Sequence, residues 1–133
     1  MFSCDASGHG PAAARILRNG VEPGEWTARF DEGQRKWIPI PVEFGTPPDT
    51  LYLLLYGTGI RNRGSLADVT VEVGDEKPPV LLAGPDPNAA GRDLVKVGPL
   101  PMSLAGGTRI IRVRVMTPFG IAVASNTVTV KFQ

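Results

Sequence analysis

The sequence predicts an all-β protein, an immunoglobulin-like β-sandwich of about seven to eight antiparallel strands with no significant helix. Three observations favour this class. The 16 glycines and 13 prolines are spread between short apolar runs, so the chain turns often. Many of those runs alternate apolar and polar residues, the period of a half-buried strand, and no window has a convincing helical period. The single cysteine, Cys4, cannot form the intersheet disulfide of antibody domains, so the likeness is to disulfide-free sandwiches.

We expect one domain over residues 1–133, because a chain of this length can bury a core without metals or disulfides. Residues 1–20 are its N-terminal segment, which we expect to be an edge strand or partly irregular. Residues 10–15 are compatible with a short helix, but they can equally lead into a first strand through Ile16 and Leu17.

A β-hairpin is predicted next. Residues 25–30 and 36–44 form its two halves, and residues 31–35 form the turn. In the second half, the apolar residues at even positions share one face, whereas Pro39 and Pro41 cannot donate the hydrogen bonds of a ladder. We therefore expect this second half to be an edge strand.

Residues 51–56, LYLLLY, are apolar on both alternating faces, which predicts a central strand buried on both sides. Glycines at 57, 59 and 64 follow, as they would in a phosphate-binding loop. A dinucleotide fingerprint requires G-x-G-x-x-G and then a helix, but position 62 is Asn and a strand pattern follows at 69–73. We therefore interpret these glycines as a turn or bulge between two strands.

The later strands are predicted from alternation at residues 69–73, 110–115 and 128–132. In the middle run, Arg112 and Arg114 alternate with apolar residues, so both arginines are expected on the face away from the core. Turns containing proline separate the strands at residues 77–79, 84–88 and 98–101.

Charge and hydropathy exclude several classes of partner. A net charge of +1 produces no field that would attract nucleic acid or an anionic membrane, so neither is expected as a partner. No stretch approaches the roughly 18 apolar residues of a membrane-spanning helix, so membrane insertion is not expected. The first residues lack both a basic start and a continuous apolar run, so the sequence as written shows no secretory signal.

Five phrases occur in order along nearly the whole chain. They are FSCDASGHGPAAA at 2–14, LYLLLYGTGIRNRGSLADVTVEVG at 51–74, PVLLAGP at 79–85, VGPLPMSLAGG at 97–107 and SNTVTV at 125–130. Together they resemble the uncharacterised C-terminal domain of large exported proteins from Solibacter-type acidobacteria. The chain departs from that pattern at Leu94, Val95 and Lys96, where relatives tend to carry Gln-Val-Asn.

The resemblance implies an immunoglobulin-type sandwich module at the end of a longer exported or cell-surface polypeptide. It transfers no catalytic residue, because the family has no established activity.

The sequence contains few residues that could catalyse a reaction or bind a metal ion. The only histidine, His9, lies near Cys4, but both belong to a Gly/Ser-rich segment without an evident oxyanion donor or orienting carboxylate. The pair is also too small for a structural zinc site, which needs four Cys or His ligands. We predict no catalytic residue, no cofactor and no metal ligand.

Carboxylates are scattered, and none follows the spacing of a calcium loop. Asp86, Asn88 and Asp93 share one loop and leave a weak calcium site open as an alternative, although turn residues that bond their own backbone explain them as well. A pair of carboxylates for glycoside hydrolysis cannot be chosen from spacing alone.

Trp37 and Trp26 are the candidate contact residues for a ligand or partner. They lie on opposite halves of the predicted hairpin, where they can form an exposed aromatic platform. By alternation we expect Trp37 to be the exposed one, and the alternative for Trp26 is packing with Phe30 in the core.

The sequence thus predicts a module that is not an enzyme and that binds a protein or cell-surface partner as part of a longer exported chain. The alternative is a carbohydrate-binding module that uses exposed aromatic residues. The oligomeric state stays open at this stage.

Overall fold

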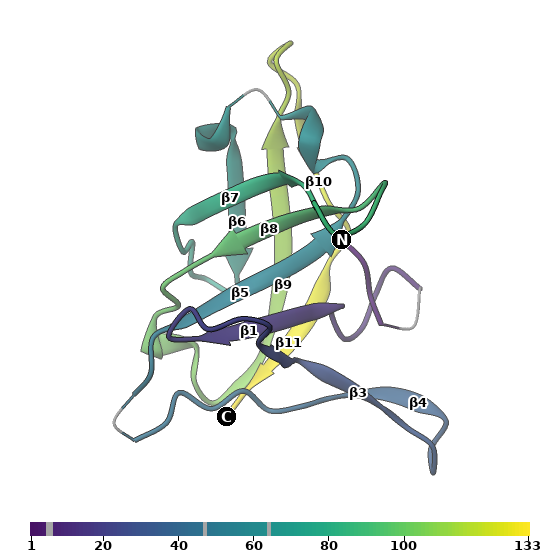
Figure 1. Cartoon of the computed structure of the whole chain (residues 1–133), viewed down its shortest axis with the longest axis vertical. Coiled ribbons are helices and arrows are strands. Elements are labelled where there is room, and N and C mark those ends of the chain that lie inside the picture. Colours follow the sequence, from purple (N-terminus) through teal and green to yellow (C-terminus); the bar gives the residue numbers. More distant parts are fainter. Residues whose placement is uncertain (5–6, 47, 64) are drawn as a thin grey trace.

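The structure is a computed structural model that describes residues 1–4, 7–46, 48–63 and 65–133 of the chain. It is all-β, with two antiparallel sheets that face each other and a two-stranded ribbon beside them (Figure 1). The first sheet has the order β2-β1-β5-β8-β7. Its strands are β1 (Ala14–Arg18), β2 (Glu25–Trp26), β5 (Leu51–Gly57), β7 (Val80–Pro85) and β8 (Asp93–Val97).

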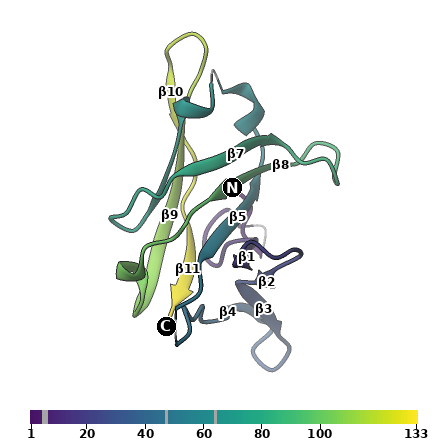
Figure 2. The same cartoon turned by 60° about the vertical axis from the view of Figure 1, so that its left-hand side comes forward.

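The second sheet is built around one long strand, β9, which is hydrogen-bonded along both sides. On one side it pairs with β6, and on the other it pairs with β11 along its first half and with β10 along its second half. Figure 2 shows this sheet behind the first one, whose strands run across it. The four strands are β6 (Val69–Val73), β9 (Gly107–Met116), β10 (Ala122–Ala124) and β11 (Val128–Phe132).

The core lies between the two sheets and is formed by the inward positions of their strands. Leu53, Val95 and Val97 from the first sheet are fully buried, as are Val71 and Ile111 from the second. Burying side chains of this size contributes about 1.5–3 kcal/mol each. The alternation predicted for residues 110–115 is confirmed, because Ile111 and Val113 are buried whereas Arg114 is exposed.

The described residues contain eleven strands rather than the seven or eight expected from the sequence. Seven of these strands have five or more residues, and the remainder have two to four. Three of the short strands lie within the predicted hairpin, whereas β10 (Ala122–Ala124) is too short to show a measurable alternation and was not predicted. The only helical turns in the described part of the chain are three 3-10 turns: Ile60–Asn62, Leu66–Asp68 and Met102–Leu104.

The predicted central strand is confirmed. β5 lies between β1 and β8, and every residue of it except Tyr52 is buried. Gly57 ends the strand, and Gly59 adopts a left-handed conformation (φ 80°) before the first 3-10 turn, which agrees with a turn between strands. The third glycine of that pattern, at position 64, lies outside the described residues.

Within the N-terminal segment, residues 14–18 form a strand, as one of the two sequence interpretations expected. This strand is not an edge strand, because β5 pairs with all of it and β2 covers Arg15 and Ile16 on its other side. Just before it, Pro11 bridges to Thr129 of β11, and the backbone N–H of Ala12 donates to the Thr129 carbonyl (2.9 Å). The segment therefore connects the two sheets.

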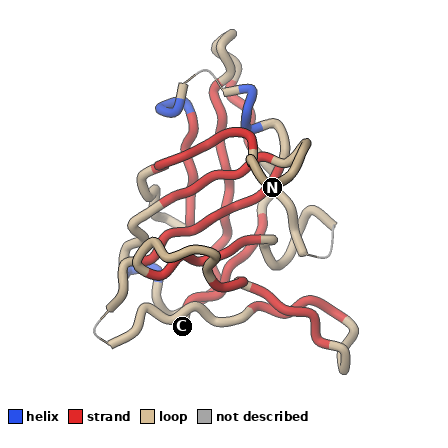
Figure 3. The backbone as a smooth tube through the Cα atoms, in the orientation of Figure 1, coloured by secondary structure: helices blue, strands red, loops and turns tan. Residues whose placement is uncertain are grey.

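The predicted hairpin forms, but it is shorter than expected. β3 (Ala28–Asp31) and β4 (Lys36–Pro39) pair as a ribbon that projects from the sheets (Figures 1 and 3). The second half is not one edge strand, because Pro39 ends β4 and Val42 then bridges in parallel to Phe132 of β11. In the described residues we find no helix that is both long and apolar enough to pass through a membrane.

Candidate functional site

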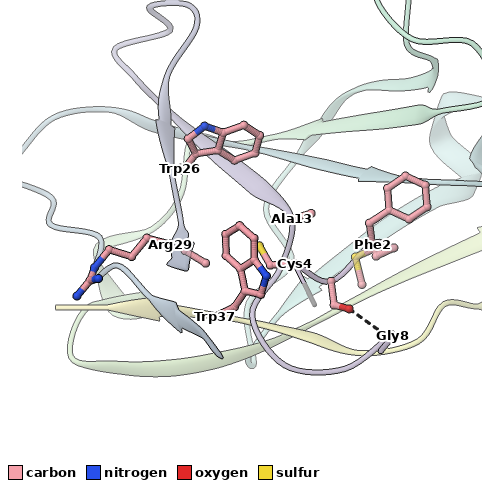
Figure 4. A pocket seen from close by; sticks show the side chains of 10 residues that line it. Phe2, Cys4, Gly8, Ala13, Trp26, Arg29 and Trp37 are labelled. Atoms are coloured by element: carbon pink, nitrogen blue, oxygen red, sulfur yellow. Dashed lines mark hydrogen bonds between the residues drawn. The ribbon is translucent and has the colours of Figure 1, made fainter. Parts of the chain in front are cut away.

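A pocket of about 780 Å³ lies between the ribbon (residues 28–39) and the N-terminal arm (residues 1–4 and 7–13). Figure 4 shows the side chains that surround it. We call it the ribbon pocket. It is lined by Met1, Phe2, Ser3, Cys4, Gly8, Ala13, Trp26, Ala28, Arg29 and Trp37.

Both tryptophans selected from the sequence line this pocket. Trp37 comes from β4, where it lies opposite Phe30 in the ladder. The two rings meet edge to face with their centroids 5.7 Å apart, a favourable aromatic geometry. This contact fixes the Trp37 ring against the neighbouring strand and leaves it half-buried.

Trp26 comes from β2, where its ladder partner is Arg15 of β1. The Arg15 guanidinium lies over the indole ring, 4.1 Å from the ring centroid, so it covers one face as a cation–π contact. The side chain is nevertheless 50 % exposed.

The expected exposures of the two tryptophans are therefore reversed. Trp37, expected to be the exposed one, is half-buried by Phe30, whereas Trp26 is exposed. Phe30 is itself 47 % exposed and does not join the core with Trp26. The reason is the ribbon: it projects beyond the sheets, so neither of its faces is a core face and alternation along it does not separate buried from exposed positions.

The opposite wall is the N-terminal arm, which backbone hydrogen bonds hold in place. The N–H of Phe2 donates to the carbonyl of Tyr56 in β5 (2.8 Å), and the N–H of Cys4 donates to that of Pro11 (2.9 Å). The Cys4 thiol also donates to the Ala12 carbonyl (3.3 Å). The wall is thus a small hairpin fixed to the first sheet.

Asn126, which precedes β11, fastens this arm from the other side. Its side-chain amide donates to the carbonyls of Gly8 (2.6 Å) and Met1 (3.0 Å), and its Oδ1 accepts from the Met1 amine (2.8 Å). Partial burial of that amine lowers its pKa below the ordinary value. The arm is therefore held both by the first sheet and by the segment that precedes β11, and this wall of the pocket is preformed.

The pocket has an apolar interior. Among the described residues that line it, Arg29 has the only charged side chain and none has a carboxylate. The aliphatic part of Arg29 forms part of the wall, while its guanidinium points away from both tryptophans (Figure 4). Such a site favours apolar or aromatic groups over charged ones.

Asp86 and Asp93, which were considered as calcium ligands, form ion pairs with arginines. Asp86 accepts from the backbone N–H of Asn88 (2.9 Å) and from the Arg92 guanidinium (2.6 Å to Nε), and these bonds, the Asn88 bond first, lower its pKa. Asp93 accepts from the backbone N–H (3.0 Å) and Nε (2.6 Å) of Arg61. Across the described ranges, no three His, Cys, Asp or Glu residues are placed to share a metal ion.

Cys4 and His9 both belong to the N-terminal arm, but their surroundings differ. His9 is exposed and does not line the pocket, whereas Cys4 does. The backbone of His9 exchanges two hydrogen bonds with the Ser7 hydroxyl, which donates to its carbonyl (2.9 Å) and accepts from its N–H (3.1 Å). The segment forms a compact polar turn.

Sequence reasoning missed the N-terminal wall of the pocket. A signal was available, since apolar residues at 2 and 4 precede glycines at 8 and 10 and a return run of alanines, which is a hairpin pattern. Nothing in the sequence indicated that this hairpin lies opposite the ribbon. Comparison of the chain with family models, with curated proteins and with solved structures found no match.

Proposed function

We propose that this chain is a non-catalytic interaction module that binds a protein partner by accepting an apolar side chain in the ribbon pocket. One observation carries the proposal: Trp26 and Trp37, the only tryptophans of the chain, line the same pocket. Tryptophan is enriched among the residues that dominate binding energy at protein interfaces.

The ribbon supports this proposal because the core does not require it. Ala28 is its only fully buried residue, and Phe30 is 47 % exposed. A two-stranded ribbon is at best marginally stable in water by itself. Exposed aromatic residues on such an element are costly to maintain unless they are covered in a complex.

The size and composition of the pocket also fit a preformed binding site. Ligand pockets typically enclose about 300–1,000 Å³ and are mainly apolar with few polar groups. At about 780 Å³, the ribbon pocket has room for one or two large side chains. Its walls are held by hydrogen bonds before binding, so little conformational entropy is lost on association.

We further infer that the two sheets are an immunoglobulin-like frame. Taken in chain order, the seven strands of five or more residues are arranged as first-second-fifth-fourth in one sheet and third-sixth-seventh in the other. This order is that of constant-type immunoglobulin domains. The strands cross more steeply in Figure 1 than in the nearly aligned sheets of those domains.

Export as part of a longer chain is a proposal that rests on the family resemblance alone. Protease treatment of intact source cells, followed by mass spectrometry of released peptides and of the medium, is expected to detect peptides of this chain. Detection only after cell lysis would contradict it.

The binding proposal is tested by selecting random display peptides on the immobilised chain. We expect peptides rich in aromatic and aliphatic residues, whose dissociation constants rise at least about tenfold in Trp37→Ala and in Trp26→Ala. Ile110→Ala is the matched control, because Ile110 is 59 % exposed on the second sheet. Selected peptides that bind Trp37→Ala and Trp26→Ala as tightly as the wild type would contradict the proposal.

Carbohydrate binding is the second candidate, and the exposure of Trp26 favours it. One ring face is covered by Arg15, and the opposite face is left for stacking on a sugar. Against it, the described residues that line the pocket include no carboxylate that would accept hydrogen bonds from sugar hydroxyls. Retention of the wild type on cellulose, chitin or xylan, with loss in Trp26→Ala, would replace the protein-binding proposal.

A further inference from the structure

The loop between β9 and β10 forms a second apolar surface, which we call the apolar tip (residues 116–124). Phe119 is 90 % exposed, and Ile121 and Val123 are each more than half exposed. All residues from 118 to 124 are exposed, so the tip contributes nothing to the core. Exposed apolar groups gathered in one place indicate an interaction surface.

The tip is a defined turn. The backbone N–H of Thr117 donates to the Ile121 carbonyl (2.9 Å), and that of Gly120 donates to the Thr117 carbonyl (2.9 Å). The Thr117 hydroxyl accepts from the Ile121 N–H (3.2 Å), and Gly120 takes the left-handed conformation that closes the turn (φ 77°). These bonds hold Phe119 at the end of the hairpin before any contact forms.

The tip itself carries no charged residue, and the nearest charge along the β9–β10 hairpin is Arg114, the ladder partner of Ala124. Residues 115–130 contain no Asp, Glu, Lys or Arg, and the short β10 strand is exposed along its whole length. Natural proteins commonly place charges on such exposed edges to prevent association. Their absence here indicates that the tip is covered when the protein functions.

We propose that the apolar tip of one copy of this chain inserts Phe119 into the ribbon pocket of a second copy. This inference rests on the proposed function of the pocket and names its partner. The tip and the ribbon lie at opposite ends of the long axis in Figures 1 and 2, so one chain cannot fill its own pocket. The contact is head to tail, which leaves a free tip and a free pocket at the ends of each assembly.

The charges of the two surfaces are compatible. The described lining of the pocket is mainly apolar and has no carboxylate, and the tip carries no charge, so insertion of Phe119 adds no charged group to the pocket. Arg29 lines the pocket with its aliphatic part while its guanidinium points away from both tryptophans (Figure 4), so an incoming phenyl ring meets mainly apolar atoms. A lipid surface fits less well, because the uncharged tip offers no Lys or Arg to anionic headgroups.

The area of the contact predicts weak association. A phenylalanine buries about 150–250 Å² at most, and even with the flanking apolar residues the total stays below the roughly 1,200 Å² of a standard interface. We therefore expect dissociation constants of about 10 µM to 1 mM in solution. Copies that are attached to the same surface would associate more strongly, because attachment raises their effective concentration.

Sedimentation velocity between about 1 µM and about 1 mM tests the proposal. We expect the mean mass of the wild type to rise with concentration, and Phe119→Ser and Trp37→Ala to remain monomeric when measured separately. Phe119→Ser keeps an intact pocket and Trp37→Ala keeps an intact tip, so their equimolar mixture is expected to form a 1:1 dimer and no larger species. Leu82→Ser, at a side chain 51 % exposed on β7, is the control and should associate like the wild type.

A monomeric wild type at the highest concentration, a mixture that remains monomeric, or association that survives in Phe119→Ser would each overturn the proposal. Binding of the wild type to neutral phosphatidylcholine vesicles that is lost in Phe119→Ser, without self-association, would assign the tip to lipid and also overturn it. Trp26→Ala serves as a second pocket variant if Trp37→Ala does not fold. If the wild type is monomeric but selected peptides bind it more tightly than they bind Trp37→Ala, the self-association inference fails. The proposed function of the pocket then stands.

Discussion

At the scale of single residues, the connection from β7 to β8 is organised by two buried carboxylates. Asp86 is 6 % exposed and accepts hydrogen bonds from Asn88 and Arg92, while the Arg92 guanidinium lies 4.5 Å from the centroid of the Tyr56 ring. Asp93, with no exposed surface, accepts from Arg61. Asp86 thereby holds Arg92 against Tyr56 of β5, and Asp93, the first residue of β8, holds the 3-10 turn that contains Arg61.

These contacts make part of the stability dependent on pH. Asn88 first, and then Arg92, hold the pKa of Asp86 below its ordinary value of 3.8. A carboxyl group whose folded pKa is depressed contributes stability above its unfolded pKa and loses it as the pH falls through the folded pKa. Urea unfolding is therefore expected to show that Asp86→Asn is less stable than the wild type at pH 7, with a difference that shrinks steadily below about pH 4.

Asp75→Asn is the control for losing one carboxylate, because Asp75 is exposed. It should change the free energy of unfolding little at either pH. A stability difference between wild type and Asp86→Asn that is the same at pH 7 and at about pH 2.5 would show that the Asp86 carboxylate has no such role.

At the scale of elements, Gly98 allows β8 to leave the first sheet directly beside β5. Its φ is 146°, and a Cβ there would lie 2.6 Å from Cδ1 of Tyr52 and 2.9 Å from the Leu51 carbonyl oxygen. That oxygen also accepts from the N–H of Leu100 (2.9 Å), so it cannot move without breaking a bond. Only glycine fits this close approach.

Gly98→Ala is expected to reduce the free energy of unfolding by about 2–4 kcal/mol through backbone strain and overpacking. Gly107→Ala is the matched control. Gly107 begins β9 without a positive φ, and no atom lies within 4 Å of its added Cβ, so a change within about 0.5 kcal/mol is expected. Equal midpoints in urea for the two variants would contradict the assigned role of Gly98.

The long strands could be predicted from the sequence, and the ribbon only in part. β6, β9 and β11 follow directly from apolar alternation, since their inward faces are core faces, and β5 follows from a continuous apolar run that is buried on both faces. The ribbon has no core face, so the same rule misplaced Trp37 and Phe30. The path after Pro39 was also not predictable, because Val42 is buried by a single bridge to Phe132 that no local pattern encodes.

At the scale of the whole molecule, the residues of the proposed binding site and the residues of the core are largely separate sets. The core residues belong to the two sheets and their connections, whereas both tryptophans lie outside the core. From the sequence, the two tryptophans could be named as contact residues but not as neighbours of Phe2 and Cys4, since the pocket forms where the N-terminal arm lies opposite the ribbon, a separate segment of the chain. Composition gives no information on that long-range placement.

This separation is tested by a variant in which Asn-Gly, a two-residue hairpin turn, replaces residues 30–37. The exchange keeps the ladder pair of Arg29 and Ile38 and removes Phe30 and Trp37. Because the deleted residues lie outside the core, we expect the variant to unfold cooperatively at nearly the wild-type urea midpoint.

The dissociation constant of a selected peptide for this variant, measured by titration calorimetry, tests the central claim most directly. We expect affinity at least about tenfold weaker than for the wild type, because the variant lacks Trp37 of the ribbon pocket. An unchanged dissociation constant in a variant that still unfolds cooperatively would contradict the claim that the ribbon pocket is the binding site.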